Sequence, residues 1–80
     1  MIDATARAEQ AKRLLDDPLL TEVLGEIEKA AITAWGSTAL GDVEHREMAY
    51  HSLKASRRVR DTLQGVVDNG LVEASRAVRR

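Results

Sequence analysis

The stretch LLDDPLLTEVLGEIEKAAITAW, residues 14–35, decides the fold class of this chain. Its second part places apolar side chains at steps of three and four residues, the spacing that aligns one face of an α-helix. Asp17 is suited to cap that helix, and Pro18 fits its first turn, where a missing N–H costs no hydrogen bond. The pattern predicts a helix over 18–36. Its apolar stripe consists of Leu20, Val23, Leu24, Ile27, Ala30, Ala31, Ala34 and Trp35.

A shorter helix is predicted before this segment. Residues 4–15 are rich in Ala, Lys and Arg, and Asp3 stands where a cap is expected. A helix of this length with mostly Ala on its apolar stripe is not stable alone in water. Alone it would fray.

The longest helix is predicted over 43–68. It follows the connection WGSTALGD at 35–42, which contains two Gly and ends in Asp42, a suitable cap. The sequence DNG at 68–70 predicts the end of this helix, because Asn or Gly readily adopts the left-handed conformation that terminates helices. Residues 71–79 are then expected to form a separate, frayed helix.

These elements predict an all-α fold, with residues 1–80 as one small domain. We expect an antiparallel helical hairpin with a short N-terminal helix and a frayed C-terminal helix. Trp35 is expected to anchor the end of the hairpin, with insertion into the pocket of a partner protein as the alternative. The predicted interaction seam consists of Leu20, Val23, Leu24, Ile27, Trp35, Leu53, Val59, Leu63 and Val66.

Charge is divided unevenly along the chain. Residues 1–50 carry ten acidic and five basic side chains, whereas residues 51–80 carry three acidic and seven basic ones. Such a division favours pairing of an acidic with a basic helix, within one chain or between two. With 80 residues, no Cys, no Phe, one Trp and one Tyr, the core is marginal. We therefore expect a homo-oligomer or a subunit docked on a larger protein.

The run HSLKASRRVR at 51–60 is a candidate surface for anions or nucleic acid, because phosphate binding requires clustered cations. The alternative is a solvated helix face that pairs with acids of the preceding helix, such as Glu22, Glu26 and Glu28. The net charge of −1 favours this alternative, since DNA-binding domains are usually basic. The candidate phosphate contacts are Arg46, Lys54, Arg57, Arg58 and Arg60.

Reaction chemistry is not indicated. Glu44, His45, Glu47 and His51 are the only cluster of metal-ligand types, but the two His are six residues apart and fall on different helix faces, so we expect no metal site. No serine has a recognisable base or strained turn, and no Gly-rich phosphate loop is present. We expect no enzymatic activity and no cofactor. Neither a membrane span nor a signal peptide is recognisable, so a cytoplasmic location is expected.

Two segments, LLDDPLLTEVLGEIEKAAITAW at 14–35 and DVEHREMAYHSLKASRRVRDTLQGVVDNG at 42–70, follow a framework DPLL…E…W…D.E.RE…L…L…G. In this the chain resembles small helical proteins of tailed bacteriophages that are encoded among head-assembly and DNA-packaging genes. The resemblance covers about residues 6–70 and consists of helix caps and apolar spacing. It implies a virion or head-assembly accessory protein in the host cytoplasm or the virion, and it transfers no catalytic or binding residues.

Three functions are therefore considered. The first is a structural or assembly protein of a phage particle, with itself or another phage protein as partner. The second is a nucleic-acid-binding packaging or regulatory factor that uses the basic run at 51–60. The third is a phage inhibitor of a host protein.

Overall fold

Each helix of the computed structural model begins at an aspartate cap. The structure describes residues 3–79, with side chains as far as residue 77. Helix α1 spans Ala4–Asp16, and the Asp3 carboxylate accepts a hydrogen bond of 2.8 Å from the Ala6 N–H. Helix α2 spans Pro18–Gly36, and helix α3 spans Val43–Arg79. The predicted all-α fold is confirmed.

The other two caps act in the same way. The Asp17 carboxylate accepts hydrogen bonds from the N–H groups of Leu19 and Leu20, at 2.8 and 3.1 Å. The Asp42 carboxylate accepts one of 3.2 Å from the N–H of His45. A cap satisfies N–H groups that have no partner within the helix, so all three helix starts follow from local chemistry that the sequence already indicates.

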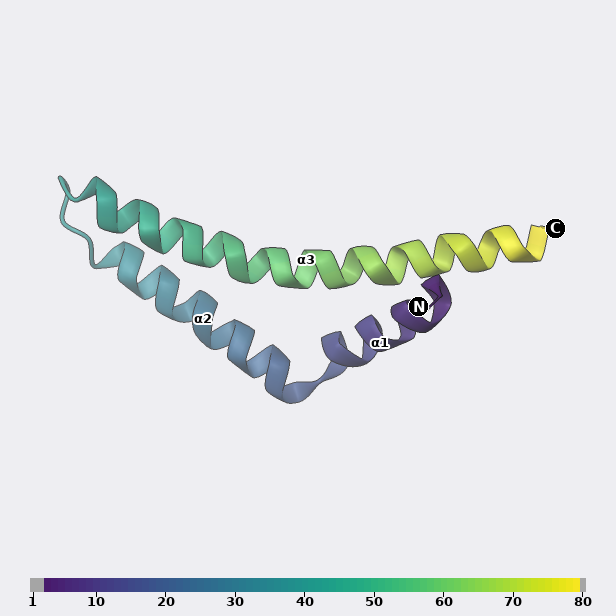
Figure 1. The fold of residues 1–80 in the computed structure, drawn as a ribbon. Helices are drawn as coiled ribbons and strands as arrows, with labels where there is room; N and C mark the ends of the chain where they lie inside the picture. The colour runs from purple at the N-terminus through teal and green to yellow at the C-terminus, as the bar shows by residue number, and fades with distance from the viewer. Residues whose placement is uncertain (1–2, 80) are drawn as a thin grey trace.

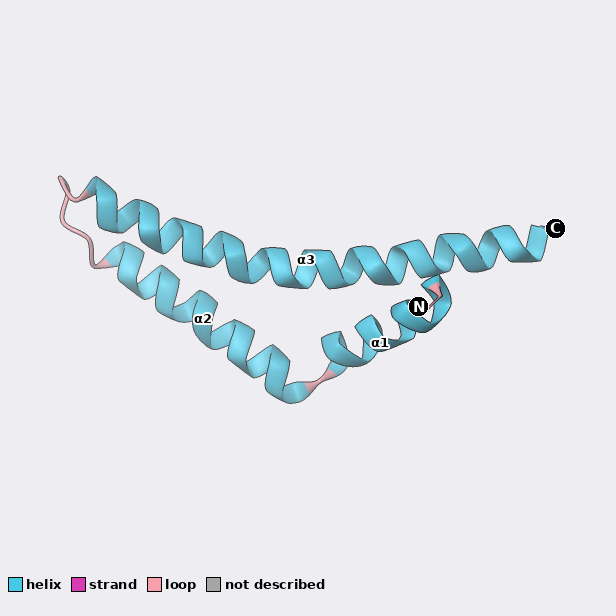
Figure 2. Ribbon diagram, viewed as in Figure 1, coloured by secondary structure: helices cyan, strands magenta, loops and turns pink. Residues whose placement is uncertain are grey.

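Helix α3 is the spine of the molecule, and α1 and α2 lie one after the other along it (Figure 1). Both run antiparallel to α3, and the chain turns between them at Asp17 (Figure 2). They contact α3 extensively and each other hardly at all. The molecule is elongated, at 59 × 23 × 20 Å with a radius of gyration of 17.3 Å, against about 12 Å for a compact chain of this length.

The α1–α3 contact is close enough to require glycine. Gly70 is buried in α3, and a Cβ atom placed on it would overlap the Cβ of Ala8 and come within 2.9 Å of the Ala4 carbonyl oxygen. The Ala-rich face of α1 and a residue without a side chain allow the two backbones to approach. A helix that would fray alone is therefore held along α3.

The predicted helix end at 68–70 is wrong. Helix α3 continues through the DNG sequence to Arg79, and no residue among those described has a positive φ. The separate helix predicted at 71–79 is therefore the last part of α3. The physical reason is that Gly70 serves the contact with α1 rather than a left-handed turn.

Candidate interaction surfaces

The α2–α3 seam has small side chains at its centre. Leu24, Ala31 and Ala49 are buried there, and the buried hydroxyl of Ser56 donates a hydrogen bond of 3.2 Å to the carbonyl oxygen of Leu24. No side chain among the described residues is fully buried. A seam of only two helices has two open sides, and each side carries a distinct surface.

One side carries aromatic and large aliphatic side chains, which we call the aromatic face: Ile32 and Trp35 of α2 with Tyr50 and Leu53 of α3. They line an open groove of about 320 Å³ above Ala31 and Ala49. Ile32, Trp35 and Tyr50 are exposed, and Trp35 is 55% accessible. Trp35 is therefore not buried within the chain, and the expectation that it anchors the hairpin core is wrong.

Basic groups border the aromatic face. The Lys54 ammonium lies 5.6 Å from the centroid of the Tyr50 ring, within the range of a cation–π interaction. The His51 ring meets Tyr50 edge-on at 5.9 Å between centroids. By helical spacing, Arg46 and Arg57 stand on the same stripe of α3 as Tyr50 and Leu53. The face is apolar at its centre, and its α3 border carries Lys54 and Arg57, with Glu47 one helical turn before Tyr50.

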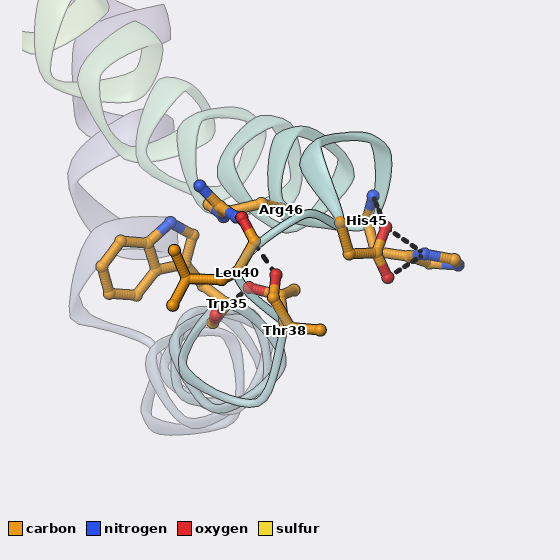
Figure 3. Close-up of polar contacts among 7 residues, drawn as sticks. Trp35, Thr38, Leu40, His45 and Arg46 are labelled. Atoms are coloured by element: carbon orange, nitrogen blue, oxygen red, sulfur yellow. Dashed lines mark hydrogen bonds and ion pairs between the residues drawn. The ribbon is translucent and has the colours of Figure 1, made fainter.

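The connection 37–42 holds the end of α2 next to the start of α3. The Thr38 hydroxyl donates to the Trp35 carbonyl at 2.7 Å, and the Arg46 guanidinium donates to the carbonyl oxygens of Ala39 and Leu40 at 3.1 and 2.7 Å (Figure 3). Arg46 is thus occupied by the loop backbone and is not a free phosphate contact. Leu40 is 98% accessible.

His45 lies on the opposite side of this connection from Trp35 (Figure 3). Its Nδ1 is 2.8 Å from both carboxylate oxygens of Asp42. The hydrogen bond with the His45 side chain, and next the one from the His45 backbone N–H, lower the pKa of Asp42 below its ordinary value of 3.8. The cap of α3 is therefore ionised at neutral pH.

The other side of the seam carries small and aliphatic side chains, which we call the neutral face. Its core lines an open groove of about 790 Å³ between α2 and α3. At helical spacing, Val23 continues the α2 side of this groove, and Ala55 and Val59 continue its α3 side. The neutral face consists of Val23, Ile27, Ala30, Ala34, Met48, Ser52, Ala55 and Val59.

The basic run meets the acidic helix at one point. The Arg60 guanidinium forms an ion pair with the Glu28 carboxylate, both partly buried. Within the described part of the chain, Glu22 and Glu26 form no ion pair, and neither do Lys54, Arg57 and Arg58, all of which are exposed. Pairing between the basic run and α2 therefore uses Arg60. Three members of the predicted phosphate-contact set, Lys54, Arg57 and Arg58, remain accessible.

The structure divides the predicted seam residues into two groups. Leu24 is buried and Leu20, Leu53, Leu63 and Val66 are half-buried, so these line the contacts within the chain. The remaining members of the predicted set are exposed: Val23, Ile27, Trp35 and Val59.

The sequence prediction did not name Ile32 or Met48 as surface contacts, although each is exposed on one of the two faces. The available signal was a second run of small and apolar residues at helical spacing beside the first.

Metal-ligand clusters and membrane-spanning stretches are both absent from residues 3–79. No group of three or more His, Asp, Glu or Cys side chains in this part of the chain could hold a metal ion. None of its helices has a stretch that is long and apolar enough to cross a bilayer.

Comparison with known proteins gives no relative: no family model, no curated protein and no solved structure matches this chain.

Proposed function

We propose that this protein is a non-enzymatic helical interaction module that docks another protein on its aromatic face, and that it acts as an accessory in the assembly of a bacteriophage particle. The exposure of Trp35 beside Ile32 and Tyr50, around an open groove, is the observation that supports docking most directly. Trp and Tyr are enriched among the residues that dominate protein interfaces. The phage setting comes from the sequence resemblance.

The chemistry of the aromatic face specifies the partner. An apolar side chain is needed for the groove, and Lys54 and Arg57 on the α3 border favour acidic residues around that side chain. An acidic amphipathic helix meets both requirements, because its apolar stripe and its charges lie on adjacent faces. The partner proposed is therefore an acidic helical segment of another particle protein.

Site-specific photo-crosslinking tests this function. A photoreactive phenylalanine analogue replaces Ile32 in one variant and the exposed Thr33, on the outer side of α2, in a matched control. In phage-infected cells, position 32 should crosslink to one particle protein and position 33 should not. Trp35→Ala should abolish the crosslink while leaving the helix content unchanged, because Trp35 is exposed. Equal crosslinking at the two positions, or absence of the chain from particles and their assembly intermediates, contradicts the proposal.

The accessible Lys54, Arg57 and Arg58 favour a second candidate function, nucleic-acid binding. The double variant Arg57→Ala with Arg58→Ala separates the two, with the exposed Arg7→Ala and Lys12→Ala of α1 as a control of equal charge. We expect the first pair to change assembly more than DNA affinity. If the unaltered protein binds DNA with a salt dependence of several phosphate contacts, and the double variant loses this binding but keeps its oligomer, the packaging or regulatory function replaces the assembly function.

A further inference from the structure

The neutral face has the pattern of a helix-packing surface that has no helix on it. Its members recur at steps of four, three and four residues in both α2 and α3, directly beside the stripes that form the seam around Leu24 and Ser56. Two adjacent stripes at this spacing are typical of a helix that packs against two neighbours, as in four-helix bundles. Among residues 3–79, α2 packs against α3 over this length and contacts α1 only slightly.

The composition of this face is unlike that of the rest of the chain. Charged residues make up 31% of the sequence, yet none of the eight members of the neutral face is charged; Asp42 and His45 line the same groove at its end next to the connection 37–42. Charges reappear at its two edges, with Glu22, Glu26 and Lys29 at the outer edge of α2 and Glu47, Lys54 and Arg58 at the outer edge of α3. An uncharged centre between one edge with an acidic excess and one with a basic excess is complementary to a copy of itself.

We propose that the neutral face binds a second copy of this chain, so that two α2–α3 hairpins stack face to face as a two-fold symmetric four-helix bundle. The small side chains Ala30, Ala34, Ser52 and Ala55 allow close approach of the stacked helices. This surface lies on the opposite side of the seam from the aromatic face, so the dimer and the docking function can each fail without the other.

Charge selects one of the two ways to stack the hairpins. A two-fold axis perpendicular to the helices places α2 over α2 of the second copy, so that acidic edges meet acidic edges and basic edges meet basic ones. An axis parallel to the helices places α2 over α3 of the second copy instead. Leu24 lies beside Ser56 within the chain. Rotation about the parallel axis leaves the position of each residue along that axis unchanged. Glu22 therefore comes level with Arg58 of the second copy. Glu26 comes level with Lys54 of the second copy, one helical turn before Arg58. Opposite charges therefore meet at these positions, and for this reason the parallel axis is the one proposed.

The exposed area agrees with this assembly. The accessible surface is 6405 Å², whereas a compact protein of the same mass exposes about 4,800 Å². A standard protein interface removes about 800 Å² from each partner. The elongated chain can therefore give up enough surface for a stable dimer and still leave the aromatic face to another protein.

Sedimentation of the full chain with Ala30→Glu tests the face. Ala30 is exposed on the neutral face, and Thr33, three residues further along α2, is exposed outside it, so Thr33→Glu adds the same charge as a control. The unaltered chain and Thr33→Glu should sediment at twice the mass of 8.8 kDa at micromolar concentration. Ala30→Glu should raise the dimer Kd about a hundredfold or more, because it buries an unpaired charge from each copy in an apolar interface. A monomeric unaltered chain, or equal masses for the two variants, overturns the proposal.

Charge reversal at the edges tests the axis without touching the apolar centre. Glu22→Lys and Arg58→Glu should each raise the dimer Kd roughly tenfold, since each replaces two exposed opposite-charge pairs by like charges. An equimolar mixture of the two variants should form heterodimers with the original Kd, because each edge then again has opposite charges. Failure of the mixture to recover overturns the parallel axis. Both residues are exposed, so circular dichroism of each variant should match that of the unaltered chain.

Discussion

The two halves of α3 are packed in different ways. The C-terminal half meets α1 through Gly70 and Ala8, where the backbones come so close that a single methyl group has no room. The N-terminal half meets α2 through a narrow row of small side chains with one buried leucine, and open grooves lie on both sides of it. The difference shows that small residues let α1 and α3 pack through their backbones, whereas the contact between α2 and α3 leaves open grooves with exposed apolar side chains on both sides.

The largest effect on stability is expected where α2 meets the N-terminal half of α3, because this contact depends on one side chain. Leu24→Ala should lower the free energy of unfolding by about 2–4 kcal/mol, because Leu24 is the one large apolar residue buried in that seam. Leu19→Ala, in the same helix and largely exposed, should change it by less than about 0.5 kcal/mol. Urea unfolding of both variants measures the difference. Similar losses for the two variants would show that α2 is held in another orientation.

The contact between α1 and α3 should be disrupted by a substitution at its closest point. Gly70→Ala should lower the free energy of unfolding by about 1–3 kcal/mol, because the new Cβ overlaps Ala8 and α1 must move away. Gly65→Ala is the matched control in the same helix. It has open space around its Cα and should raise stability by about 0.5–1 kcal/mol through better helix propensity. Opposite signs for the two substitutions in thermal unfolding confirm the close contact, whereas a gain for both rules it out.

Gly25, in α2, should respond to replacement by Ala in the same way as Gly65. No atom of a neighbouring element lies within 4 Å of a Cβ placed on Gly25, so Gly25→Ala should raise the free energy of unfolding by up to about 1 kcal/mol. This substitution decides between a tolerated glycine and one that permits close approach of another helix. A gain in stability with unchanged mass in sedimentation indicates the former. Loss of assembly would mean that a second protein covers this position.

The smallest effect is expected at the cap of α3, and it depends on pH. The pKa of Asp42 is lowered in the folded chain, so its contribution to stability is present above the unfolded value of 3.8 and is lost as the pH falls through the folded value. Asp42→Asn retains a capping side chain but does not titrate. The unaltered chain should be more stable than this variant near neutral pH, and the difference in melting temperature should shrink below about pH 4. A difference that is constant across this range contradicts the role of the Asp42 charge.

The sequence by itself determined the helices and where they begin. Asp3, Asp17 and Asp42 cap α1, α2 and α3 because capping is local chemistry within a few residues, and apolar spacing fixes the helical class. The antiparallel order of α2 and α3 also followed from the sequence, because the short connection between these two helices leaves them few other arrangements.

The structural roles of Gly70 and Trp35 were decided by tertiary structure alone. A glycine after Asn69 is equally suited to ending a helix and to admitting a neighbouring one, and only the position of α1 selects the second use. Apolar spacing around Trp35 likewise defines a wide stripe, of which a single partner helix covers one part. Which part is covered depends on the rotation of α2 against α3, a property of contacts between residues far apart in sequence that local patterns do not contain.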